Sequence, residues 1–269
     1  MTYRALALDL DGTLLGPDDM VSARNRVAVQ AAVADGWHVI LATARWYQMA
    51  ERTAHDLGLV DPVIACSGAE VRRLRDGADL FDVRLPAAFT AALYSLCDQE
   101  NGMAFVYEDR DVVLRTELSP ALRALPEVRR VETLTGDADR TPRCVLLFGD
   151  DLNALVLQTL FTDWQNQVRF LTSTTGQGHL LLTLTSSQAD KGLALRVACS
   201  DLGISTIDVV AIGDSETDIE MFKVAGASVA MGQASSVVKR EATWVTTRHD
   251  DDGVGSAIEG LLDGRLATD

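Results

Sequence analysis

Apolar and polar residues alternate along the first third of the chain with the spacing of buried strands and amphipathic helices. Apolar runs predict strands at residues 5–8, 38–42 and 62–66, and the segments between them predict helices at 22–35 and 45–57. Ser22 is a residue type that caps helices, and Gly36 and Gly58 are typical of helix ends. Nearly continuous apolar strands that are each followed by a helix indicate a parallel sheet covered on both faces.

The last third of the chain repeats this pattern, whereas the middle differs. The last third predicts helices at 191–202, 216–225 and 254–262 and strands at 209–212, 228–230 and 244–246. The middle predicts strands at 104–107, 112–114, 144–148 and 180–184 and helices at 86–100 and 151–165. We therefore predict an α/β fold in which residues 1–82 and 186–269 form a Rossmann-like, mostly parallel sheet with helices on both faces. Residues 83–185 are predicted to form an inserted α+β domain.

Composition and charge exclude several classes of protein. The chain has 269 residues and a formal net charge of −15, which disfavours nucleic acids and anionic membranes as partners because both require a basic surface. No stretch approaches the ~20 consecutive apolar residues of a membrane span, and the N-terminus lacks the pattern of a signal peptide. We therefore expect a soluble, cytoplasmic protein. The scattered Cys66, Cys97, Cys144 and Cys199 favour buried, reduced thiols over a zinc site or disulfides.

Polar residues follow the core strands where each predicted strand ends. The first strand is followed by Asp9 and Asp11, the second by Thr43 and Arg45, the third by Ser67 and Gly68, and strand 209–212 by Asp214 and Asp218. Lys191 begins the first helix after the inserted domain. Ligands of an open parallel sheet bind beyond the carboxyl ends of its strands. We therefore expect these residues to meet in one crevice.

The side chains of this group favour a bound cation and phosphoryl transfer. Four acids supply only oxygen ligands, which fits Mg²⁺: Asp9, Asp11, Asp214 and Asp218. The groups that could hold phosphate oxygens are Lys191, Thr43 and the backbone N–H groups near Gly12 and Gly68. Asp9 could attack phosphorus and form an aspartyl-phosphate. Asp11 could protonate the leaving alcohol and then accept a proton from the attacking water.

Several of these residues also have a simpler structural interpretation. Asp214 and Asp218 could only stabilise the N-terminus of the following helix, where negative charge is favourable. Arg45 could be a surface residue, and Lys191 could be a solvated residue at a helix start, although a cation is unfavourable there. The acidic pair that begins at Asp9 is harder to explain in this way, because an unpaired charge is costly when it is buried.

Four motifs resemble, in order, those of the haloacid-dehalogenase-like hydrolase superfamily. They are Asp9-Leu-Asp-Gly-Thr13, Thr43 in the stretch 41–45, Lys191-Gly192, and Gly213-Asp-Ser-Glu-Thr-Asp218. Residues 230–232 and 252–254 resemble further signatures of its Cof-type branch, whose members carry an inserted α/β cap (type IIB) between the second and third motifs. The inserted domain has that place in this chain, so the resemblance implies that it is such a cap.

The resemblance also implies a role for each motif residue. Asp9 is the expected nucleophile and Asp11 the expected general acid and base, while Thr43 and Lys191 are expected to contact the phosphate. The expected Mg²⁺ ligands are Asp9, the backbone carbonyl of Asp11, Asp214 and, directly or through water, Asp218. The further candidates for substrate contact are Gly12, Arg45, Ser67, Gly68, Thr217 and Gln233.

The sequence departs from the branch at four positions. Ala44 replaces a usual glycine, and Ser67, Thr217 and Gln233 each replace a usual asparagine. Thr217 exchanges an amide for a hydroxyl that donates only one hydrogen bond, whereas Gln233 keeps the amide one methylene further out. These differences bear on rate and substrate fit rather than on the reacting groups.

Together these features predict a Mg²⁺-dependent phosphatase that hydrolyses a small phosphomonoester, such as a sugar phosphate or a related metabolite. One alternative is a phosphomutase that uses the same aspartyl-phosphate. A second is a member that binds a phosphorylated ligand without turnover. Bacterial receiver domains combine similar residues but are about half this length. The sequence leaves the substrate and the oligomeric state open, and the specificity residues of the cap, including the segment 174–179, have no readable motif.

Overall fold

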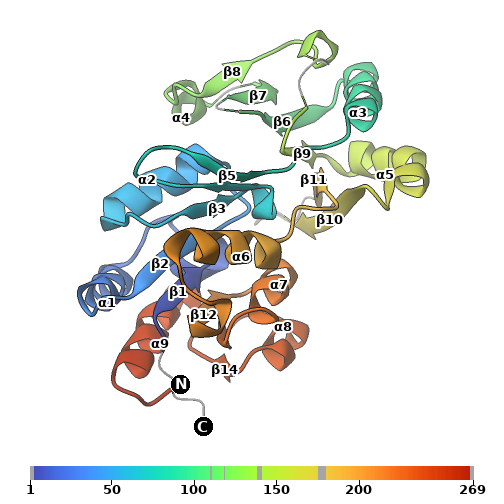
Figure 1. The fold of residues 1–269 in the computed structure, drawn as a ribbon. Helices are drawn as coiled ribbons and strands as arrows, with labels where there is room; N and C mark the ends of the chain where they lie inside the picture. Colours follow the sequence, from blue (N-terminus) through green and yellow to red (C-terminus); the bar gives the residue numbers. More distant parts are fainter. Residues whose placement is uncertain (1–2, 110, 118, 138–140, 175–179, 267–269) are drawn as a thin grey trace. The chain divides into compact units, whose positions relative to one another are not determined.

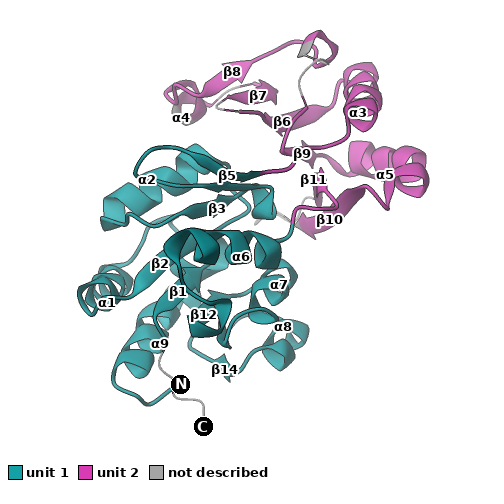
Figure 2. Cartoon of the chain, viewed as in Figure 1, with its two compact units in different colours: residues 1–81, 190–269 teal, residues 82–189 magenta. Residues whose placement is uncertain are grey.

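The chain forms two compact units in the computed structural model, which describes residues 3–109, 111–117, 119–137, 141–174 and 180–266. Unit 1 consists of residues 1–81 and 190–269, and unit 2 consists of residues 82–189 (Figure 2). The predicted domain boundaries lie one residue away at the first crossing and four residues away at the second. That the two units are separate folding domains stays a prediction.

Unit 1 is built on an eight-stranded sheet in the order β14-β13-β12-β1-β2-β3-β4-β5. Its strands are β1 (Ala5–Leu8), β2 (His38–Ala42), β3 (Val63–Ala65), β4 (Glu70–Arg72), β5 (Asp79–Asp82), β12 (Val209–Gly213), β13 (Ala227–Ala230) and β14 (Trp244–Val245). The six strands from β14 to β3 are parallel, whereas β4 runs antiparallel to β3. β1 lies between β2 and β12, so the residues that follow these three strands come together at one edge.

Helices cover both faces of this sheet, as Figure 1 shows. They are α1 (Ala23–Ala34), α2 (Tyr47–Leu57), α6 (Lys191–Leu202), α7 (Ile219–Phe222), α8 (Ser236–Glu241) and α9 (Gly253–Leu262). Residues of α6, α7 and α8 pack with one face of β1, β2 and β12 in a buried apolar cluster, while α1 packs against α9 on the other face. The predicted Rossmann-like fold with a mostly parallel sheet is therefore confirmed.

Several predicted helix ends in unit 1 are confirmed, whereas two of its predicted helices differ from the observed ones. The side chain of Ser22 accepts a hydrogen bond from the backbone of Asn25 and so caps α1, and Gly58 ends α2 in the left-handed conformation. α2 begins at Tyr47 rather than at residue 45, because Trp46 is still extended. The predicted helix 216–225 is instead a 3₁₀ turn (Glu216–Asp218) followed by the short α7.

Unit 2 is an α+β unit with a six-stranded sheet in the order β10-β11-β9-β6-β7-β8. Its strands are β6 (Met103–Tyr107), β7 (Val112–Arg115), β8 (Val128–Arg130), β9 (Cys144–Phe148), β10 (Val168–Thr174) and β11 (Leu180–Ser186), and its helices are α3 (Ala87–Gln99), α4 (Pro120–Arg123) and α5 (Asp150–Trp164). α3 and α5 bury their apolar side chains on one face of the sheet. The strands β8 and β10 were not predicted from the sequence, and residues 175–179 of the proposed specificity segment lie outside the described residues.

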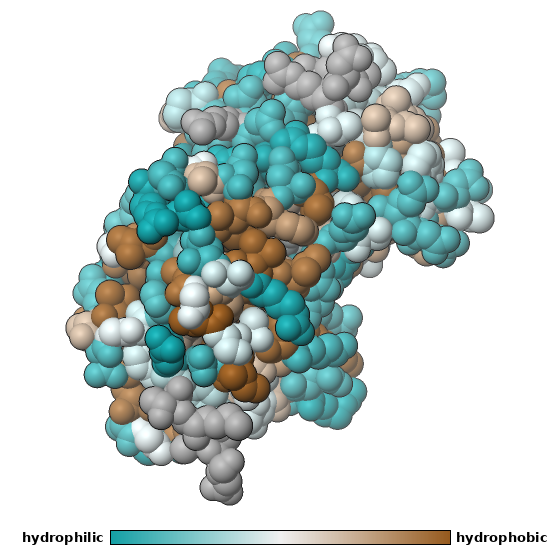
Figure 3. All heavy atoms as spheres, in the orientation of Figure 1, coloured by the Kyte–Doolittle hydropathy of each residue, from teal (hydrophilic) through white to brown (hydrophobic). Residues whose placement is uncertain are grey.

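The surface carries both polar and apolar side chains, and the cysteines lie inside the protein. Figure 3 shows apolar side chains interspersed with polar ones on one face of the protein. No helix in the described ranges combines the length and the apolar character that crossing a membrane requires. All four cysteines are buried and free, as predicted.

Candidate active site

The chain turns sharply after β1, and this turn separates the two acids of the first motif. The backbone N–H of Asp9 still donates to the carbonyl of Ile212 in β12 at 3.0 Å, so Asp9 continues the ladder. The turn Leu10–Leu14 follows, in which Gly12 has a φ of +72°. Asp9 is buried, whereas the side chain of Asp11 is 52% exposed. A straight strand would have put both carboxylates on one face, but the turn gives each its own surroundings.

Lys191 joins the first and fourth motifs through its ammonium group. Its side chain is 1% exposed, and Nζ lies 2.7 Å from Oδ1 of Asp9 and 2.7 Å from Oδ1 of Asp218. α6 can begin at this lysine because the side chain of Asp190 caps the helix and accepts from the N–H of Leu193 at 2.7 Å. Burial favours the neutral amine, but the charges of Asp218 and Asp9 outweigh it and hold the pKa of Lys191 above its usual value.

Asp218 is a fully buried carboxylate whose two oxygens both have partners. Oδ1 pairs with Lys191, and Oδ2 accepts from the backbone N–H groups of Asp214 and Ser215 at 3.0 and 2.9 Å and from the Ser215 hydroxyl at 2.9 Å. A Cβ at Gly213 would lie 2.5 Å from the Asp218 side chain, so only glycine allows this approach. Asp218 therefore orients both Lys191 and the loop after β12.

The carboxylates of Asp9, Asp214 and Asp218 fit a divalent cation. One oxygen from each lies within 4.8 Å of the others. With Lys191, three ionised carboxylates and one ammonium leave a local charge of −2, which a divalent cation that prefers oxygen ligands would balance. Burial and repulsion from Asp218 raise the pKa of Asp9 well above its usual range, and the same two causes raise the pKa of Asp214 to about 6. Without a cation the carboxylates repel one another and resist ionisation. A bound cation would remove this repulsion, so raised pKa values in the protein alone are expected at a cation site.

The side chain of Asp11 lies apart from this acidic cluster and is held by Arg45. Arg45 Nη2 lies 2.5 Å from Oδ1 of Asp11, and Nε lies 3.0 and 2.9 Å from the two Asp11 oxygens. Nη2 also donates to Oδ1 of Asp19 at 2.7 Å. The Arg45 side chain is 17% exposed and has two acidic partners, and its contact with substrate stays a prediction. Burial works against its charge, but the bonds to Asp11 outweigh it and raise the pKa of Arg45.

The second and third strands bring Thr43, Ser67 and Gly68 to this edge of the sheet. Thr43 is fully buried; its hydroxyl accepts from the N–H of Arg45 at 3.1 Å and its carbonyl from the N–H of Ser67 at 3.0 Å. Gly68 has a φ of +90°, and a Cβ there would lie 2.7 Å from the backbone nitrogen of Lys191. These residues thus support the start of α6 and the turn that carries Arg45.

Thr217 and Gln233, two further candidates for substrate contact, form hydrogen bonds within the protein. The hydroxyl of Thr217 lies 2.8 Å from that of Ser215. The side chain of Gln233 donates from Nε2 to the carbonyl of Gly12 at 2.5 Å. A Cβ at Gly12 would overlap Oδ2 of Asp214, so Gly12 is needed for the close approach of the two motif loops. The proposed contacts of Thr217, Gln233 and Gly12 with substrate stay predictions.

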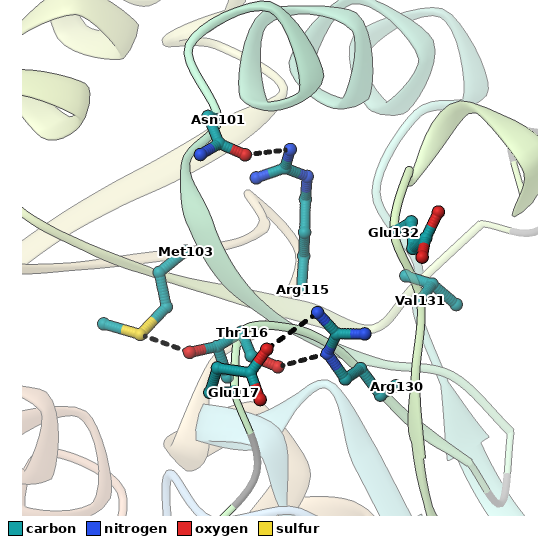
Figure 4. Close-up of a pocket in the computed structure, with 8 residues that line it drawn as sticks. All are labelled: Asn101, Met103, Arg115, Thr116, Glu117, Arg130, Val131 and Glu132. Atoms are coloured by element: carbon teal, nitrogen blue, oxygen red, sulfur yellow. Dashed lines mark hydrogen bonds and ion pairs between the residues drawn. The ribbon is translucent and has the colours of Figure 1, made fainter.

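Unit 2 contains a pocket of about 370 Å³ that none of the predicted site residues lines. Figure 4 shows its two guanidinium groups engaged with neighbouring residues: Arg115 with Asn101, and Arg130 with Thr116 and Glu117. Arg115 also donates to the carbonyl of Gly102. Both cations already form hydrogen bonds within unit 2, which disfavours the pocket as a phosphate site.

The fold and this cluster agree with a match to a known family. The model of the haloacid dehalogenase-like hydrolases matches residues 6–258. The chain belongs to this family of hydrolases. The predicted resemblance is therefore confirmed, and the match extends across both units.

Known relatives and structures in this family cover nearly the whole chain. The 5-amino-6-(5-phospho-D-ribitylamino)uracil phosphatase YwtE of Bacillus subtilis is 28% identical over 98% of this chain and 100% of its own length. The phosphoglycolate phosphatase of Archaeoglobus fulgidus is 29% identical over 96% of this chain and 98% of its own. A haloacid dehalogenase-like hydrolase from Bacteroides thetaiotaomicron superimposes with a TM-score of 0.81 at 25% identity, covering 96% of this chain and 99% of that one.

Two residues at the site had no role in the prediction from sequence. Ser215 lies inside the fourth motif, and its position three residues before Asp218 is the spacing of a capping box, which could have revealed it. Asp19 reaches Arg45 from a loop in which its own φ is +60°. No sequence pattern indicates that contact, because it depends on how the loop folds back.

Proposed function

We propose that this hydrolase is a Mg²⁺-dependent phosphatase that hydrolyses a small phosphomonoester through an aspartyl-phosphate on Asp9. The observation that carries the proposal is the buried position of Asp9 beside Lys191, with Asp214 and Asp218 completing an acidic cluster. The phosphatase names of the relatives support the reaction class.

The first half-reaction forms the covalent intermediate. Lys191 engages Oδ1 of Asp9, and in the described part of the chain no hydrogen bond reaches Oδ2. One carboxylate oxygen of Asp9 attacks phosphorus, and the bond from phosphorus to the ester oxygen breaks. Asp11, in its protonated form, gives a proton to the departing oxygen and so releases a neutral alcohol. Arg45 holds the Asp11 carboxylate in this structure, so the leaving group must compete with Arg45 for it.

The second half-reaction returns the enzyme to its starting state. Asp11, now a carboxylate, accepts a proton from a water molecule whose oxygen attacks phosphorus. The bond between phosphorus and Asp9 breaks, inorganic phosphate leaves, and Asp9 is again a carboxylate. The partly exposed position of Asp11, at 52%, is suited to contact with both an alcohol and water.

Asp9 and Asp214, with the backbone carbonyl of Asp11, are the proposed holders of Mg²⁺. Asp218 would support them through Lys191 and the loop after β12, because both of its oxygens already have protein partners. When bound, the cation would neutralise the negative charge of the phosphoryl group and of the acidic cluster. Lys191 adds a second positive charge that the fold holds in place.

A screen of phosphorylated metabolites, with and without Mg²⁺, tests the proposal. The panel should include sugar phosphates, phosphoglycolate and the phosphorylated ribityl-aminouracil on which YwtE acts by name. We expect phosphate release that requires Mg²⁺ and that is lost in Asp9→Asn. An acid-quenched reaction should show a mass increase of one phosphoryl group on the peptide that carries Asp9. Full turnover by Asp9→Asn with unchanged metal dependence would refute the assignment.

The same screen separates the phosphatase from the two alternatives. A phosphomutase would move the phosphoryl group to another hydroxyl of the substrate and release little inorganic phosphate. A member without turnover would show a Mg²⁺-dependent thermal shift with a metabolite that it never hydrolyses. Comparing released phosphate with substrate consumed distinguishes all three results.

A further inference from the structure

Gln233 connects three loops of unit 1 with its side-chain amide. Nε2 donates to the carbonyl of Gly12 at 2.5 Å and lies 3.4 Å from Oδ2 of Asp214. Oε1 accepts from the backbone N–H of His249 at 3.1 Å. The amide therefore contacts the loop after β1, the loop after β12 and the segment before α9 at once.

The backbone directly before Gln233 is anchored at Met231 and Gly232, which fixes the point from which its side chain starts. The N–H of Met231 donates to the carbonyl of Gly213 at 3.0 Å, and the N–H of Gly232 donates to the carbonyl of Thr247 at 2.9 Å. Lys239 adds a contact of 2.5 Å from Nζ to the carbonyl of Gly232. The loop thus holds the amide against the acidic cluster before any ligand binds.

Only an amide satisfies this combination of contacts. Nε2 has two hydrogens and can serve two oxygen acceptors, while Oε1 simultaneously accepts from a backbone N–H. An ionised carboxylate cannot donate, and an apolar side chain can do neither. Both ends of the amide are in use within the protein, which argues against a role of Gln233 in direct contact with substrate.

We infer that Gln233 is a positioning residue that orients the Asp214 carboxylate for the cation and fixes its distance from the Gly12 turn. This inference rests on the proposed function, because it assigns to Asp214 a metal that the proposed reaction needs. Thr13 reaches the other oxygen of Asp214 at 3.5 Å, so the carboxylate is bracketed between two donors. Hydrogen-bonding partners of metal ligands characteristically govern metal affinity by 10–100-fold.

Mg²⁺ binding without substrate tests the inference by isothermal titration calorimetry. We expect Gln233→Leu to weaken the Mg²⁺ dissociation constant roughly tenfold or more. Gln233→Asn keeps the amide but is too short to serve all three partners, so its affinity should fall between those of Gln233→Leu and the wild-type protein. Gln30→Leu is the matched control, because Gln30 is an exposed glutamine on α1 of the same unit; its Mg²⁺ affinity should equal that of the wild type.

Thermal melts in EDTA show whether a variant has lost its fold rather than its ion. Gln233→Leu should melt cooperatively, and if it does not fold, Gln233→Met replaces it, since methionine keeps the length of the side chain without the amide. Mg²⁺ affinity within twofold of the wild type in the folded apolar variant would overturn the inference while leaving the proposed function intact. A wild-type protein that binds no Mg²⁺ would instead overturn the proposed function, and the inference with it.

Discussion

Replacing Lys191 by methionine should destabilise unit 1 more than any change of a surface lysine. The ammonium group is 1% exposed and lies 2.7 Å from both Asp9 and Asp218, which are themselves buried. Methionine fills a similar volume, so the main loss is the charge. Removing one partner of a buried ion pair costs about 3–5 kcal/mol, because the remaining charges stay uncompensated in a poorly solvated site. We expect a loss of that size in the free energy of unfolding, measured in EDTA.

Urea denaturation followed by tryptophan fluorescence is a suitable assay, because Trp37, Trp46 and Trp244, three of the four tryptophans, lie in unit 1. Lys223→Met is the matched control: Lys223 is exposed beside α7, and its replacement should change stability by less than about 0.5 kcal/mol. Added Mg²⁺ should recover part of the loss in Lys191→Met, since a cation restores the missing positive charge. A loss below about 1 kcal/mol in EDTA would refute the idea that Lys191 compensates buried carboxylates.

Three further predictions concern the first motif loop, the cation and unit 2. Gly12→Ala should abolish activity and Mg²⁺ binding measured by calorimetry, because φ is +72° and the new Cβ would displace Asp214; normal binding would contradict this. Chelation with EDTA should stop phosphate release while circular dichroism shows an intact fold, and Mg²⁺ alone should restore turnover. In unit 2, burial opposes ionisation of Asp98, but backbone hydrogen bonds from Leu134 and Thr135 outweigh it and lower its pKa below 3.8. Asp98→Ala should therefore cost about 1–3 kcal/mol at pH 7. The difference from wild type should shrink in denaturation curves as the pH falls through this lowered pKa, where the wild-type carboxylate also becomes protonated. A difference that is constant from pH 7 to 3 would contradict the assignment.

The local rules of secondary structure predicted much of unit 1 and rather less of unit 2. β2 and α6 have the predicted bounds, because an apolar run between polar residues and a glycine after an amphipathic segment are strong local signals. The predictions of secondary structure failed where tertiary contacts determine whether a segment is a strand or where a helix ends. β10 pairs with β11 over its whole length, although its sequence includes a charged and several hydroxyl residues. α7 ends early, because the N–H of Gly226 bonds to the carbonyls of Thr206 and Val209.

The candidate site likewise combines residues that the sequence predicted with contacts that only the tertiary structure reveals. Asp9, Lys191 and Asp214 were predicted from the places where strands and helices begin and end, and the structure brings them together. The separate positions of the two acids of the first motif depend on the turn at Gly12. Gln233 was expected to contact substrate, which stays a prediction; that its amide also reaches Gly12 and Asp214 is visible only in the structure.

The sequence by itself determined the central strands β1, β2 and β12, the order of the motifs and the family, because apolar periodicity and motif spacing are local properties of the chain. Only the tertiary structure decided which oxygen meets which cation. Lys191 is 182 residues from Asp9 along the chain, yet their side chains are in direct contact. Asp11, only two residues from Asp9, instead faces Arg45. The physical reason is that charge pairs depend on distances in space, and the packing of parallel strands sets these distances between segments that are remote in sequence.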